Sequence, residues 1–287
     1  DNMRATIEDL RIPWNTIRLS TEGSLERLRD LVAYHDAPVA TMTYLVHSMI
    51  SEEVHRNGFK VAFSGTSADE LFTGYYDHYL LHLAEMARAG SDREWREAWQ
   101  THILPTVRNP CFRDPDLYVK SPGAREHIYD HQELLRTALR EPWEEPFLET
   151  DYGQPLLRNR MLNELLTENT PVALHEDDLN SMRYSVENRS PYLDTNLFRA
   201  AFAIPVRELI RDGHAKSVLR DAVQGILNDS VRLDRRKKGF NASLNSLFPM
   251  QDPGFRSFLK DPASPLSNLV NWKVVEPWME ENPASNH

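Results

Sequence analysis

The chain has 287 residues, of which 40% are hydrophobic and 26% charged, so its composition is that of a folded globular protein and not of a disordered chain. Its formal net charge of −10 argues against a general binder of nucleic acid or of anionic membranes, because both need a cationic face. The single cysteine, Cys111, cannot form an internal disulfide, the start has no signal-peptide core, and no apolar run approaches the roughly 20 residues that span a bilayer. We therefore expect a cytoplasmic protein that contacts neither nucleic acid nor a membrane.

The first sixty residues carry helical patterns that lead into a strand. A short helix is predicted over 5–10, an apolar stripe over 25–32 predicts a second, and a broad apolar face over 42–54 predicts a third that ends before Gly58. Residues 59–63 are predicted to form a short buried strand. A helix that feeds a strand is typical of a parallel α/β sheet covered by helices.

The remainder of the chain is predicted to be mainly helical. Residues 80–166 favour helix apart from a proline- and aromatic-rich loop at 104–118, and 158–168 form an amphipathic stretch. Residues 174–240 alternate acidic and basic clusters with short apolar helices. The segment beyond residue 240 is polar and proline-rich and carries no recognisable motif, so we place a boundary there.

A glycine turn follows the predicted strand directly, in the run S-G-T-S-A-D-E-L-F at 64–72. Ligands of open α/β sheets bind beyond the carboxyl ends of strands, and Gly65 permits the close approach of a phosphate. Asp69 and Glu70 would repel that phosphate unless a divalent cation lay between them, so a Mg²⁺-nucleotide is expected. In the simpler structural interpretation Ser67 caps a helix and Glu70 closes a capping box, and both interpretations can hold together.

Two charged regions follow further along the chain. The run H-E-D-D at 175–178 is, in the simplest interpretation, a solvated face. Met182, Val186 and Tyr192 nevertheless have the pattern of core positions, which would bring some of these charges close to the interior, where they need partners. The basic cluster R-L-D-R-R-K-K-G-F at 232–240 could be a nucleic-acid or targeting patch, but its Gly-Phe end indicates a turn anchored in the core. Its lysines, together with Lys216 on a short helix, could stabilise the charge that builds up on a leaving pyrophosphate.

Five sequence blocks occur in an order that resembles the C-terminal synthetase domain of glutamine-hydrolysing asparagine synthetases, over about residues 36–240. The blocks are S-G-T-S-A-D-E-L-F-T-G-Y, D-D-L-N-S-M, E-N-R-S-P-Y-L-D, K-S-V-L-R and R-R-K-K-G-F. The resemblance implies an adenine nucleotide α-hydrolase-like fold of the pyrophosphatase type, a parallel α/β sheet flanked by helices, with a helix-rich C-terminal part. Residues 1–240 would form part of an ATP-dependent synthetase domain, and residues 241–287 a C-terminal extension.

The chemistry implied by this resemblance is the activation of a carboxylate by ATP. Attack of the carboxylate, aspartate in that family, on the α-phosphate gives an acyl-adenylate and pyrophosphate, and ammonia from glutamine then displaces AMP. The expected partners are therefore ATP, Mg²⁺, aspartate or another carboxylate, ammonia, and a glutaminase domain in the intact protein. By position, Asp69 would hold the Mg²⁺-pyrophosphate, Ser64 and Gly65 would frame the nucleotide, and Glu70 belongs to the same block.

The resemblance also assigns catalytic positions, and it shows departures from the family pattern. Lys216 and Lys237 match lysines that the family directs at phosphates, and Asp177 falls where many members have a glutamate. Thr66 stands where the family usually has a glutamate near the reacting acyl group, and threonine cannot act as a base at neutral pH. Leu179 replaces a usual arginine. These two departures leave the identity of the carboxylate open.

Two family features are missing from the sequence, namely an S-G-G-x-D-S loop and a glutaminase domain with an N-terminal cysteine. We therefore expect this chain to be a fragment that begins inside the synthetase domain. Such a fragment should bind ATP weakly and turn over nothing by itself.

Other functions remain open. A relative resembling β-lactam synthetase or a sugar-modifying amidotransferase would keep the fold and act on another carboxylate, and a non-catalytic interaction module would keep the fold alone. A metal-dependent hydrolase could use histidines spaced i and i+4 on one helix face, although eleven histidines make such pairs common by chance. The histidine pairs are His78 with His82 and His127 with His131, beside Asp77 and Asp130.

Overall fold

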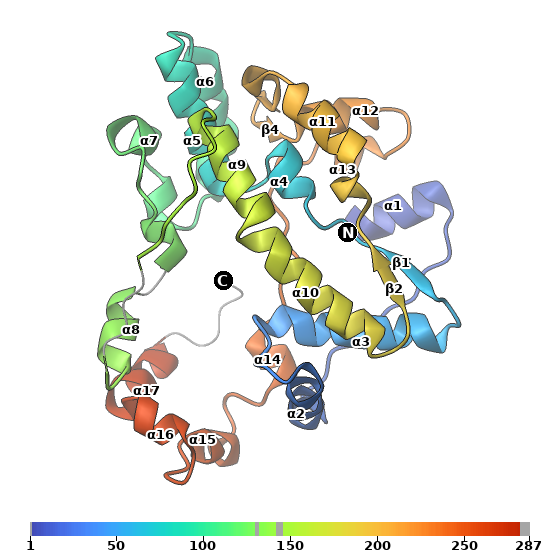
Figure 1. The fold of residues 1–287 in the computed structure, drawn as a ribbon, viewed down its shortest axis with the longest axis vertical. Coiled ribbons are helices and arrows are strands. Elements are labelled where there is room, and N and C mark those ends of the chain that lie inside the picture. The colour runs from blue at the N-terminus through green and yellow to red at the C-terminus, as the bar shows by residue number, and fades with distance from the viewer. Residues whose placement is uncertain (1, 130–131, 142–145, 282–287) are drawn as a thin grey trace.

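The computed structural model describes residues 2–129, 132–141 and 146–281, and helices dominate it (Figure 1). The helices up to residue 138 are α1 (Asn2–Leu10), α2 (Ser24–His35), α3 (Met42–Arg56), α4 (Ala68–Phe72), α5 (Tyr76–Arg88), α6 (Arg93–His102), α7 (Leu117–Lys120) and α8 (Gln132–Ala138). The later helices are α9 (Leu156–Leu166), α10 (Asn169–Met182), α11 (Thr195–Ala203), α12 (Ser217–Ala222), α13 (Asp229–Arg232), α14 (Leu244–Leu247), α15 (Pro253–Leu259), α16 (Leu266–Leu269) and α17 (Trp272–Glu281). The patterns over 25–32, 42–54 and 158–168 thus correspond to α2, α3 and α9. Short 3₁₀ turns lie at Leu104–Thr106, Pro110–Phe112, Glu126–Tyr129, Pro191–Leu193 and Val206–Glu208.

One pair of parallel strands lies beside the predicted glycine turn. β1 (Val61–Phe63) pairs with β2 (Glu187–Arg189), with Ala62 opposite Asn188. The predicted strand and its parallel pairing are confirmed, but its predicted burial is wrong, because 70% of Phe63 is exposed. Within the described residues β1 pairs with β2 alone, so the broad parallel sheet implied by the fold class remains a prediction.

A tight hairpin connects the other strand pair. β3 (Ile210–Arg211) and β4 (His214–Ala215) are antiparallel. Asp212 and Gly213 both have positive φ, of 50° and 72°, which is the backbone that a two-residue turn between twisted strands requires. The hairpin delivers Lys216 immediately after β4.

The core consists of three apolar clusters. The largest packs α5 against α6, α9 and the β3–β4 hairpin, the second packs α2 against α3, and the third joins α4, α9 and α11. Leu247 and Phe248 belong to the second cluster, so residues beyond 240 complete the packing of α2 and α3. The domain boundary at residue 240 remains a prediction.

The two helices α9 and α10 run diagonally through the middle of the molecule, and α10 crosses α3 (Figure 1). A buried amide fixes this crossing, because Asn180 Nδ2 donates to the Tyr44 carbonyl oxygen at 3.0 Å. The crossing brings acidic residues of α10 next to α3, although about 130 residues separate the two segments.

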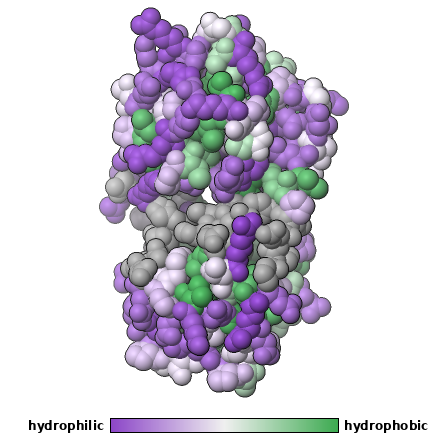
Figure 2. Space-filling view, turned by 90° about the vertical axis from the view of Figure 1, so that its left-hand side faces the viewer, coloured by the Kyte–Doolittle hydropathy of each residue, from purple (hydrophilic) through white to green (hydrophobic). Residues whose placement is uncertain are grey.

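Hydrophilic residues cover most of the coloured surface on the face shown in Figure 2, and hydrophobic residues gather there in small groups. Across residues 2–129, 132–141 and 146–281, none of the helices combines the length and apolarity that a membrane crossing requires.

A buried histidine in α5 should make the fold sensitive to acid. His82 is 1% exposed, its Nε2 lies 3.1 Å from the Val206 carbonyl oxygen, and burial lowers its pKa to about 4. Its stabilising contribution is therefore complete above the pKa of an unfolded imidazole, about 6.5, and is lost as the pH falls toward 4. When the pH is lowered from 7 to 5, we expect the unfolding free energy of the wild-type protein to fall by about 2 kcal/mol more than that of H82Q. Urea denaturation at both pH values measures this difference, and parallel losses in the two proteins would contradict it.

Candidate active site

An open cleft of about 860 Å³ lies where the turn after β1, α3, α4, the start of α10, α12 and the basic segment 231–241 meet. Its lining is more cationic than the protein as a whole, since six lysines and arginines face four acidic residues in a chain of net charge −10. The charged lining residues are Lys216, Arg220, Arg235, Arg236, Lys237 and Lys238, with Asp69, Glu70, Glu168 and Asp234. Such a surplus favours an anionic ligand.

The carboxylate of Asp69 is the meeting point of two lysines in this cleft. Lys216 Nζ forms an ion pair with Oδ1, and Lys237 Nζ with Oδ2. Burial opposes ionisation, but the two ammonium groups outweigh it and hold the pKa of Asp69 below its ordinary value. The structure thus brings together three of the predicted site residues, which lie 168 positions apart at the extremes.

Lys216 owes its position to the backbone at the end of α4. Its N–H lies 3.2 Å from both the Phe72 carbonyl oxygen and Thr73 Oγ1. Its φ of 57° lies in the left-handed region, which costs an L-residue about 1–2 kcal/mol. The contacts to α4 and the β3–β4 hairpin hold this conformation and direct the side chain to Asp69.

Lys237 is placed by its two neighbours in the basic segment. Arg236 and Lys238 both form ion pairs with Asp234, at 2.9 and 2.7 Å. Lys237 pairs with Asp69 instead, and its ammonium group also lies 4.8 Å from the centre of the Tyr75 ring. The predicted anchoring of the Gly-Phe end in the core is wrong, because 55% of Phe240 is exposed. The ion pairs of Asp234 hold the segment instead, and both of its lysines line the cleft.

The turn after β1 places small polar groups at the cleft. Ser64 Oγ lies 3.0 Å from Thr66 Oγ1 and 3.1 Å from Ser190 Oγ, which joins the two strand ends. Gly65 and Thr66 line the cleft, and a Cβ atom at Gly65 would meet nothing within 4 Å. The structure thus leaves open space beside Gly65.

The predicted capping box is wrong. Ser67 has a φ of 73° and makes no side-chain cap, because its hydroxyl lies 2.9 Å from Thr170 Oγ1 of α10. Glu70 is buried and accepts a hydrogen bond from the Tyr75 hydroxyl at 2.6 Å. Burial, followed by the charge of Glu70, raises the pKa of Tyr75. Glu70 is thereby held beside Asp69 and lines the same cleft.

Gly74 is a site residue to which the sequence assigned no role. A Cβ atom there would lie 2.1 Å from Asp69 Oδ1, far inside any observed contact. The Gly74 N–H also donates to His78 Nδ1 at 3.2 Å. The only sequence signal was the place of this glycine at the end of the first family block.

The acidic run of α10 is not a solvated face, so that prediction is wrong for two of its residues. Asp177 is 8% exposed, and its Oδ1 lies 2.6 Å from His47 Nδ1. Glu176 is also buried, and it accepts a hydrogen bond from the Ala40 N–H at 2.9 Å. Burial was possible because His47 of α3 and the Ala40 N–H, just before α3, each supply a partner for one carboxylate. Sequence reasoning missed His47, since no local motif marks it.

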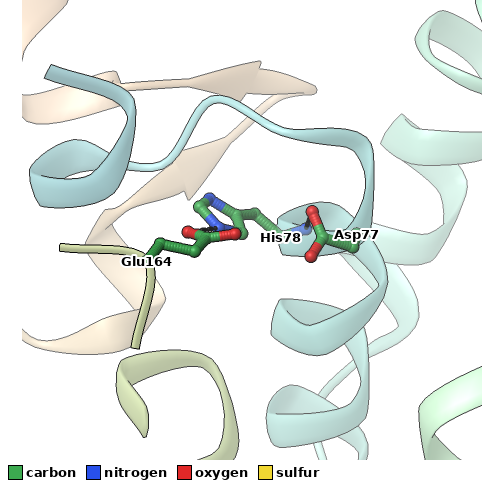
Figure 3. A group of neighbouring side chains, drawn as sticks. All are labelled: Asp77, His78 and Glu164. Carbon is green, nitrogen blue, oxygen red and sulfur yellow. Dashed lines mark hydrogen bonds and ion pairs between the residues drawn. The ribbon is translucent and has the colours of Figure 1, made fainter. Parts of the chain in front are cut away.

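His78 and His82 do not form the metal site that their spacing allows. His78 Nε2 lies 2.7 Å from Glu164 Oε2, whereas His82 Nε2 faces the Val206 carbonyl oxygen. Asp77, His78 and Glu164 do approach one another (Figure 3), with candidate ligand atoms within 4.8 Å.

Arg160 already supplies a cation to that acidic group. Its Nε lies 3.2 Å from Glu164 and 3.5 Å from Asp77, so the buried carboxylates are balanced by a guanidinium. His127 approaches Asp77 at 3.7 Å, while His131 and Asp130 lie outside the described residues.

A strand, a glycine turn, two neighbouring acids and two converging lysines thus meet around one cationic cleft. The asparagine synthase family model matches residues 1–287, and the chain belongs to this family. It is 25% identical over 234 residues to asparagine synthetase [glutamine-hydrolyzing] 1 of Bacillus subtilis (strain 168). The aligned region covers 77% of this chain and 37% of that protein. It is also 25% identical over 272 residues to asparagine synthetase [glutamine-hydrolyzing] 3 of the same organism. That aligned region covers 93% of this chain and 40% of the relative. The chain thus spans less than half the length of these relatives.

Proposed function

We propose that the full-length protein is an ATP-dependent amide-forming ligase that activates a carboxylate, aspartate or a related acid, as an acyl-adenylate. Ammonia from glutamine, supplied by a glutaminase domain, then displaces AMP. The observation that carries the proposal is the convergence of Lys216 and Lys237 on Asp69 inside a cationic cleft. Family membership supports it, because both relatives are named as glutamine-hydrolysing synthetases.

The lysines would act on the phosphates during formation of the acyl-adenylate. A carboxylate oxygen of the substrate attacks the α-phosphorus, and the bond to the β-phosphate oxygen breaks with its electron pair going to pyrophosphate. Fixed ammonium groups stabilise charge on this leaving group because they need no reorganisation as it develops. Lys216 and Lys237 neutralise Asp69 in this structure, and they would contact the polyphosphate from the moment ATP binds, before the charge develops.

The donor chemistry of the cleft fits Mg²⁺, since Asp69 and Glu70 both line it and hard cations prefer carboxylate oxygens as ligands. Asp69 would hold the ion, which when bound neutralises phosphate charge. Ser64 and Gly65 would frame the nucleotide, and Gly65 leaves open space for a close approach. Thr66, next to them, can donate a hydrogen bond to the acyl group but cannot accept a proton at neutral pH.

Carboxylate-dependent exchange of labelled pyrophosphate into ATP tests this proposal. Purified full-length protein with Mg²⁺ should catalyse exchange only when its carboxylate substrate is present, and a panel that includes aspartate identifies that substrate. Omission of the carboxylate is the matched control. Absence of exchange across the panel, with the protein folded, would contradict the ligase and favour a non-catalytic interaction module.

A further inference from the structure

A histidine and an aspartate form a close pair in the wall of the cleft. His47 on α3 and Asp177 on α10 approach at 2.6 Å between Nδ1 and Oδ1. The carboxylate is buried, whereas the side chain of His47 is 29% exposed and lines the cleft. The imidazole thus lines the cleft, whereas its aspartate partner is buried and is not among the lining residues.

This contact fixes which nitrogen of His47 can accept a proton. An ionised Asp177 accepts a hydrogen bond from Nδ1–H, so the lone pair of the neutral ring is on Nε2. Within the described part of the chain, His47 Nε2 has no hydrogen-bond partner. The ring is held from two sides, by Tyr44 at 5.4 Å and by Phe240 at 5.3 Å between ring centres.

The basic segment links this pair to the Asp69 end of the cleft. Lys237 contacts Asp69, and Phe240 contacts His47 only three residues later. Their Cα atoms can be no more than about 11 Å apart, because consecutive Cα atoms are 3.8 Å apart. One short segment therefore contacts both groups, and Thr66, which also lines the cleft, carries no basic group.

We propose that His47, oriented by Asp177, is the general base for the amine that attacks the acyl-adenylate. This inference rests on the proposed function. The nitrogen lone pair forms the bond to the acyl carbon, and one N–H proton passes to His47 Nε2. The acyl C–O bond then breaks, and its electron pair leaves with AMP. The imidazolium returns its proton to water, so the step needs no further reactant.

The test compares amide formation with pyrophosphate release in the full-length protein supplied with ammonium. General bases contribute about 10²–10⁴-fold, so H47A should lower the yield of amide per pyrophosphate by about 100-fold, with the acyl-adenylate lost to water. Added imidazole should restore part of the amide formed by H47A. D177N should lower the same ratio, and added imidazole should not restore it, because the side chain of His47 still occupies the place that free imidazole would take. H55A is the matched control, since His55 is exposed on the same helix and should leave the ratio unchanged.

Each result of this experiment is decisive. An unchanged ratio in H47A, while wild-type protein shows carboxylate-dependent pyrophosphate exchange, would overturn the role of His47 and leave the ligase intact. A lowered ratio that imidazole does not restore would assign His47 a structural role and also overturn the inference. Absence of exchange in wild-type protein would remove both proposals together.

Discussion

K237Q is expected to lower carboxylate-dependent pyrophosphate release by the full-length protein about 10²–10³-fold, the usual loss when one fixed donor to a developing charge is removed. K216Q should cost about as much. Because both lysines contact Asp69, we expect the double variant to lose much less than the product of the single losses. Steady-state pyrophosphate release by the four proteins measures this coupling.

K120Q is the control for these variants, because Lys120 is an exposed lysine paired with Asp114 outside the cleft. Wild-type rates in K237Q, or strictly multiplicative losses in the double variant, would contradict a shared phosphate site.

G74A should inactivate the protein through sterics alone. Gly74 does not have positive φ, so alanine suits the backbone, but its Cβ atom would lie 2.1 Å from Asp69 Oδ1. The carboxylate must move by an ångström or more, and misplacement of that size costs about 100-fold in rate. We therefore expect pyrophosphate release to fall at least about 100-fold, together with weaker activation by Mg²⁺.

G123A is the matched control for G74A, because a Cβ atom at Gly123 meets nothing within 4 Å. Circular dichroism and thermal melting would show whether G74A keeps its fold. Full activity in a folded G74A protein would show that the position of Asp69 does not matter for the reaction.

The sequence predicted those parts of the fold that depend on local pattern. The apolar stripe of α3 has helical period, and Gly58 follows its end with a φ of 81°. β1 was located correctly because a short apolar run precedes a glycine turn. The family resemblance implied that Asp69, Lys216 and Lys237 all serve the phosphates, whereas helical periodicity says nothing about contacts over such separations.

The errors arose where a distant partner overrode a local rule. Ser67 stands at a position that predicts a helix cap, but its hydroxyl is hydrogen-bonded to Thr170 instead. Asp177 has the sequence of a solvated charge, but His47 pairs with it across the α3–α10 crossing. The exposed side chain of Phe63 also departs from its apolar pattern, because within the described residues the strand has a single neighbour.

At Lys216 the left-handed backbone favours glycine, whereas the proposed function requires a cationic side chain. A glycine would adopt that φ of 57° without the penalty of about 1–2 kcal/mol, so it would relax the junction between β4 and α12. The same replacement would delete a cation from the cleft and leave Asp69 with a single counter-ion. Screening for thermal stability alone would therefore favour the very substitution that removes a charge which we propose holds a polyphosphate.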